Sequence, residues 1–189
     1  MSRSEQESET IKTRGVIIMN KYSLESSEKW FDPETFNWKS GSEALCKCMP
    51  DEFDTWFDPE KFDWETGSKA LCEFVADKFD IWWDPKRFNW KDASIALCKF
   101  LYEKFKKWWD KDKFNWESAS WALCYYLGDK LNAWWDKERY NWKDQSWALC
   151  EYLTVDQFEK WWDKDKFNWK KDGWRIRDYF PEKSKIWGD

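Results

Sequence analysis

The side chains with the greatest chemical potential in this sequence are its cysteines, five of which recur at a constant spacing of 26 residues. A disulfide needs Cα atoms within about 7 Å, and a zinc site needs several ligands around one ion. Equivalent positions in stacked helical repeats are expected to lie about 10 Å apart, which satisfies neither requirement. The recurring cysteines are Cys46, Cys72, Cys98, Cys124 and Cys150. We interpret them as small core residues.

Other chemistry is also poorly supported by the residue types present. The chain has no histidine, which removes the commonest general acid or base and the commonest metal ligand. The sequence shows neither a glycine-rich phosphate loop nor a nucleophile with a neighbouring base. We therefore expect a protein that is not an enzyme and needs no metal or cofactor.

Aromatic side chains are abundant, with 20 Trp, 14 Phe and 7 Tyr. Most recur at the same place in every copy of a repeat, which is typical of a core. Positions that differ between copies say more about function. The residue before the recurring Ala-Leu-Cys is Trp121 or Trp147 in two later copies, and Tyr125 follows one of the cysteines.

Trp121 and Tyr125 are four residues apart and share one face of a helix. We expect Trp121, Tyr125 and Trp147 to form an aromatic patch that binds another protein. The alternative is a bulkier core at this end of the chain.

A basic ladder also follows the repeat, and its rungs are candidates for binding an anionic ligand or nucleic acid. Each cation lies three residues after an aspartate, however, so a local ion pair is easily formed. The net charge of -5 also argues against a protein that coats nucleic acid. The rungs are Lys61, Arg87, Lys113, Arg139 and Lys166.

These residues must be positioned by a repeat whose period of 26 residues indicates stacked units. Residues 1–20 are predicted to be a disordered tail, 21–29 an N-terminal capping helix and 30–187 a repeat solenoid. In the last unit Arg175-Ile176-Arg177 replaces Ala-Leu-Cys, as a C-terminal cap requires. The units are 30–55, 56–81, 82–107, 108–133, 134–160 and 161–186, and the fifth contains one extra residue near Thr154-Val155.

Each unit is predicted to contain short helical pieces. One helix carries Ala-Leu-Cys and begins near a serine such as Ser42. A second begins at an acidic N-cap such as Asp77, and a third is a tight turn at a sequence such as Asp58-Pro59. The expected fold is all-α, a right-handed-type solenoid of about six Trp-rich short-helix repeats with N- and C-terminal caps.

The functional expectation is a protein–protein interaction or scaffold module whose partner is another protein. The alternatives are a nucleic-acid or anionic-ligand binder that uses the basic ladder, and a self-associating structural subunit of a larger particle. Apolar runs such as residues 16–19 are far too short to cross a membrane, so no membrane partner is expected. The polar N-terminus and unpaired cysteines favour a cytoplasmic, reducing location.

Overall fold

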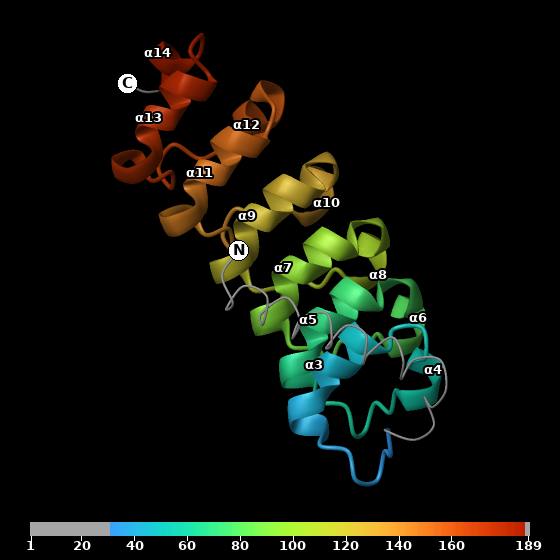
Figure 1. The fold of residues 1–189 in the computed structure, drawn as a ribbon. Coiled ribbons are helices and arrows are strands. Elements are labelled where there is room, and N and C mark those ends of the chain that lie inside the picture. Colours follow the sequence, from blue (N-terminus) through green and yellow to red (C-terminus); the bar gives the residue numbers. More distant parts are fainter. Residues whose placement is uncertain (1–30, 188–189) are drawn as a thin grey trace, which may run out of the picture.

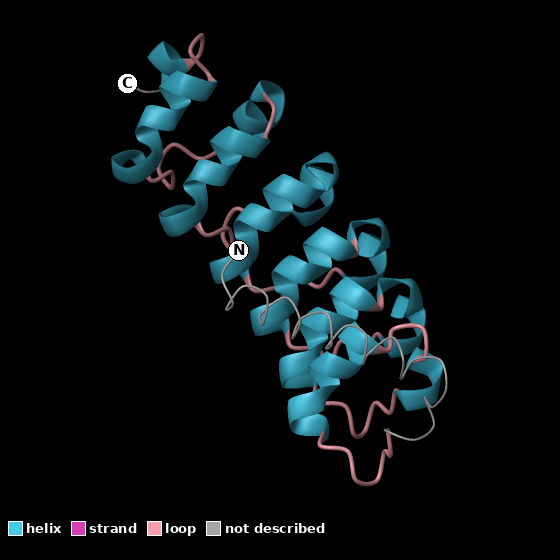
Figure 2. Cartoon of the chain, in the orientation of Figure 1, coloured by secondary structure: helices cyan, strands magenta, loops and turns pink. Residues whose placement is uncertain are grey.

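The computed structural model describes residues 31–187, and all regular structure within that range is helical (Figure 2). The predicted N-terminal tail and capping helix lie outside the described residues. Long helices occupy one side of an elongated stack and short helices the other (Figure 1). Each long helix packs on the long helix of the next unit. The predicted all-α solenoid is therefore confirmed.

Each unit contributes one long helix and one short helix. The long helices are α3 (Trp38–Cys48), α5 (Trp64–Phe74), α7 (Trp90–Phe100), α9 (Trp116–Leu127), α11 (Trp142–Tyr152) and α13 (Trp169–Tyr179). The short helices are α4 (Phe53–Trp56), α6 (Phe79–Trp82), α8 (Phe105–Trp108), α10 (Leu131–Trp134), α12 (Val155–Trp161) and α14 (Ser184–Trp187). Three 3₁₀ turns precede α6, α8 and α10, namely η1 (Ala76–Lys78), η2 (Tyr102–Lys104) and η3 (Gly128–Lys130).

The long helices begin at a tryptophan, and the prediction that a serine marks their start is wrong. In α7 the N-cap is Asn89, whose side chain accepts a hydrogen bond from the amide of Asp92. The equivalent residue caps every long helix, as asparagine or as Asp63. The prediction of acidic N-caps for the short helices is also wrong. Asp77 lies inside η1, and the N-cap of η1 is Val75, which makes no side-chain hydrogen bond.

The recurring serine instead connects successive units. The Ser94 hydroxyl donates to the Trp90 carbonyl at 2.5 Å and accepts the backbone N–H of Asn115, in the next unit, at 3.1 Å. The Asn115 side chain donates in turn to the Lys91 carbonyl at 2.6 Å. Because buried polar groups need partners, this arrangement fixes how one unit lies on the next. The serines that bridge in this way are Ser42, Ser68, Ser94, Ser120 and Ser146.

The first tryptophan of units two to five lies at the centre of the core, and these residues are Trp56, Trp82, Trp108 and Trp134. Trp108 is 1% exposed, and its indole N–H donates to the Leu101 carbonyl at 2.8 Å. The same bond joins Trp56 to Met49, seven residues earlier, and recurs in the intervening unit and in the one that follows. It closes the turn between the long and short helices and satisfies a buried carbonyl.

The extra residue of the fifth unit lies where the sequence placed it. The second, third and fourth units pass from the long helix through a 3₁₀ turn into a four-residue helix. Here α12 is one continuous helix, and the side chains of Thr154 and Gln157 form a capping box at its start. In the last unit Ile176 keeps the core position of leucine, while Arg177 is exposed where other units bury cysteine.

Candidate partner-binding surface

The three predicted patch residues lie together on the long-helix side of the stack. Trp121 and Tyr125 project from α9 with ring centroids 6.3 Å apart. Trp147 of α11 stacks on Trp121 at 6.4 Å, with an angle of 24° between the rings. The 26-residue period therefore places equivalent side chains of adjacent units in contact.

Two further tyrosines complete this cluster, which we call the aromatic patch: Trp121, Tyr125, Tyr126, Trp147 and Tyr152. The Tyr125 ring lies 4.6 Å from Tyr126 and 4.8 Å from Tyr152, edge to face in both cases. Trp147 and Tyr152 are 5.7 Å apart. Edge-to-face and offset contacts of this kind are the favoured geometries for aromatic rings.

Some side chains of the aromatic patch pack against the core, and others are exposed. Tyr125 is 55% exposed. The two tryptophans are half-buried and pack against the hydrophobic core, so the expectation of a bulkier core is partly correct for them. Each tryptophan thus anchors the cluster in the core while contributing to a surface around Tyr125.

Tyr126 and Tyr152 escaped prediction because an aromatic residue recurs at their position. The equivalent residues of the two preceding units are Phe74 and Phe100. The change from phenylalanine to tyrosine was the signal that could have identified them. Partial burial raises the pKa of both tyrosines, so their hydroxyls remain protonated and can donate hydrogen bonds.

A charged residue borders the patch on the side of the last unit. The Arg175 guanidinium lies 5.8 Å from the Trp147 ring centroid and 4.6 Å from that of Trp174. It also pairs with Glu151 at 3.3 Å. Trp174, at the same repeat position as Trp121 and Trp147, is 46% exposed and extends the aromatic surface.

The rungs of the basic ladder bind the preceding unit. Arg87 donates to the Pro59 carbonyl and to Glu60. Its expected local pair with Asp84 is also present, at 3.4 Å. The remaining rungs donate to a carbonyl or a carboxylate of the preceding unit: Lys61, Lys113, Arg139 and Lys166. The ladder therefore ties successive units together.

The five recurring cysteines lie in the core, each at most 1% exposed, and none of them forms a disulfide. Burial raises the pKa of Cys46, Cys124 and Cys150 to about 12, which leaves almost no reactive thiolate near neutral pH. Cys48 is exposed. Across residues 31–187 there is no group of three or more potential ligand side chains that could hold a metal ion.

The geometry defines a Trp-rich helical solenoid with an aromatic surface near its C-terminal end. Among the described helices, each is too short or too polar to cross a bilayer. Comparison of the chain with protein-family models, curated proteins and solved structures found no significant match.

Proposed function

We propose that this protein is a non-enzymatic interaction module that binds another protein through the aromatic patch. The observation that carries the proposal is the continuous contact of five aromatic side chains around the exposed Tyr125. In the second unit the positions of Trp121 and Tyr125 are occupied by Lys69 and Glu73. Tryptophan and tyrosine are the residues most enriched at the centres of protein interfaces.

A second feature supports the proposal by holding the patch in one shape. The Gln145 side chain of α11 accepts the Trp121 backbone N–H at 2.6 Å and donates to the Glu117 carbonyl at 2.7 Å. It thereby inserts into the backbone hydrogen bonding of α9, directly below the patch. A surface that is already ordered loses less conformational entropy when a partner binds.

The alternatives have less support. An anionic ligand would have to compete for the ladder cations with carbonyls and carboxylates of the protein itself. A purely structural subunit would not require a cluster of aromatic side chains in mutual contact around an exposed tyrosine.

The proposal is tested with substitutions that introduce residues found at the equivalent positions of another unit. The double variant Trp121→Lys, Tyr125→Glu reproduces the second unit at these positions, and Tyr125→Glu alone changes the most exposed ring. Tyr102→Lys is the matched control, since Tyr102 is 45% exposed and lies outside the patch. Tagged proteins are purified from the native cell, and the bound partners are quantified by mass spectrometry.

We expect both patch variants to lose about tenfold or more of a specific partner, because central aromatic residues dominate binding energy. The control should retain the partner, and circular dichroism should show equal helicity in all four proteins. Partners captured equally by the wild type and the patch variants would refute the proposal.

A further inference from the structure

Two series of ion pairs link successive units, and one junction interrupts both of them. Along the short helices a lysine pairs with an acid 24 residues earlier: Lys78 with Asp54 at 3.4 Å, Lys104 with Asp80 at 3.1 Å, and Lys183 with Glu159 at 2.5 Å. The short-helix series also lapses at Gln157, whose neutral side chain donates instead to the Gly128 carbonyl. For Lys130 the residue 24 positions earlier is another lysine, Lys106.

The missing acid changes the local pairing. Lys130 instead forms an ion pair with the adjacent residue, Asp129, at 2.8 Å. Lys106 is exposed and has no ion pair within residues 31–187. In the basic ladder, four of the five rungs pair with an acid of the preceding unit, whereas Lys113 faces Lys86 at that position. The junction between units 82–107 and 108–133 is therefore the one at which both series are interrupted.

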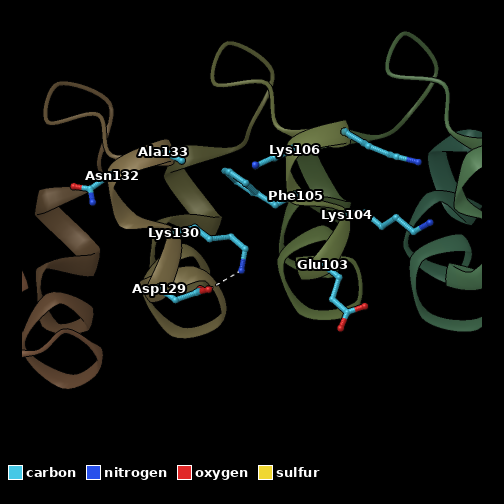
Figure 3. A pocket seen from close by; sticks show the side chains of 9 residues that line it. Glu103, Lys104, Phe105, Lys106, Asp129, Lys130, Asn132 and Ala133 are labelled. Carbon is cyan, nitrogen blue, oxygen red and sulfur yellow. Dashed lines mark hydrogen bonds and ion pairs between the residues drawn. The ribbon is translucent and has the colours of Figure 1, made fainter.

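A groove of about 400 Å³ lies at this junction between α8 and α10 (Figure 3). Phe105 and the small, exposed Ala133 contribute apolar surface to it. The equivalent of Ala133 is Ile81 in the second unit, so this junction has more room for an incoming side chain. Two acids, Glu103 and Asp129, line the groove together with four lysines, Lys104, Lys106, Lys107 and Lys130.

The charge and shape of the groove select among possible occupants. Lys104 and Lys107 share a single partner, Asp80, at 3.1 and 2.5 Å, which leaves positive charge in excess around the groove. A base of a single-stranded nucleic acid stacks on a broad exposed ring face, and Phe105, at 3% exposure, offers only a small part of its ring, which suffices for contact with an apolar side chain. An acidic peptide that also carries an apolar side chain matches both the rim and the apolar lining.

We propose that the groove between α8 and α10 binds an acidic segment of a partner protein, with an apolar side chain of that segment in contact with Phe105 and Ala133. Carboxylates of the segment pair with Lys106 and Lys130. Figure 1 shows α8 and α10, which border the groove, on the short-helix side of the stack, and α9 and α11, which carry the aromatic patch, on the long-helix side. The groove is therefore a separate binding surface.

The experiment measures fluorescence anisotropy of a labelled synthetic peptide, Glu-Asp-Glu-Leu-Phe-Glu-Asp-Glu, titrated with the full chain. Lys106→Asp supplies the acid found at this position in the two preceding units and restores the ion pair with Lys130. This variant should fold normally while its affinity falls about tenfold or more. Ala133→Ile, which copies the second unit, should also weaken binding. Lys91→Asp makes the same charge change at an exposed lysine outside the groove and should bind like the wild type.

Several results would overturn the proposal. The first is that the wild type does not bind the peptide. The second is that Lys106→Asp and Lys91→Asp lose the same amount of peptide affinity. The third is that affinity is unchanged when the Leu-Phe of the peptide is replaced with Ser-Ser. Displacement of the peptide by a short oligothymidylate, unaffected by Ala133→Ile, would indicate a general polyanion surface instead. Dimerisation seen by light scattering in the wild type but not in Lys106→Asp would identify a second copy as the occupant.

Discussion

Replacing Ser94 with alanine should weaken the stack at its middle. The change removes the 2.5 Å bond to the Trp90 carbonyl and the 3.1 Å bond from the Asn115 N–H. Ser94 is 1% exposed, so a water molecule cannot readily replace its hydroxyl. Two lost hydrogen bonds, one of which leaves a backbone N–H without its acceptor, cost about 2–3 kcal/mol. The higher helix propensity of alanine offsets about 0.5 kcal/mol of this loss. The net loss should be about 2 kcal/mol.

Two measurements test this value. Guanidinium unfolding followed by circular dichroism should show a lower and broader transition, because units and interfaces contribute separately to the stability of a stack. Hydrogen exchange should become faster at the Asn115 amide in particular. Ser118→Ala is the matched control, since Ser118 is an exposed serine in the first turn of α9. If Ser94→Ala is no more destabilising than Ser118→Ala, the bridging role of the serine is refuted.

Two further predictions follow from the buried titratable groups. In the native protein only Cys48 should react rapidly with a thiol reagent at pH 8, and Cys48→Ser should abolish that reaction; rapid native reaction of the recurring cysteines would contradict their burial. Asp172 is 2% exposed, and burial raises its pKa above the ordinary value of 3.8, so the folded state binds its proton more tightly than the unfolded state does. Its contribution to stability is therefore greatest below pH 3.8 and is lost as the pH rises through the folded-state pKa, and Asp172→Asn should remove this component from urea unfolding measured between pH 3 and pH 7. An identical pH profile in the variant would count against this assignment.

The fold was largely predictable because the 26-residue sequence repeat determines it. A 26-residue repeat of large apolar residues, interrupted by breaker residues, can bury its aromatic load only by stacking short helices. The helix starts were not predictable in the same way. Asn89 lies between two aromatic residues, Phe88 and Trp90, and its role as a cap becomes recognisable only when the helix is known to begin at Trp90.

The candidate surface was predictable only where residues depart from the repeat. Trp121, Tyr125 and Trp147 interrupt a series of smaller or charged residues, so helical spacing and the period together place them in contact. Tyr126 was missed because its ring recurs and only its hydroxyl is new. The partner of Arg87 was also missed, because Glu60 lies 27 residues away and becomes a neighbour only through the packing of units.

The serine and asparagine bridges have a consequence for how the length of this chain can change. Removal of residues 56–81 would bring Asn89 to the place where Asp63 now meets the Ser42 hydroxyl, and every bond across the new junction could form again. A deletion one residue shorter or longer within a helix would misalign all of them. The fifth unit accommodates its extra residue because this residue lies in the turn before α12, and the bond between Ser146 and Asn168 is kept across 22 residues instead of 21. Duplication or loss of whole units is thus a route by which such a protein could grow or shorten while remaining folded.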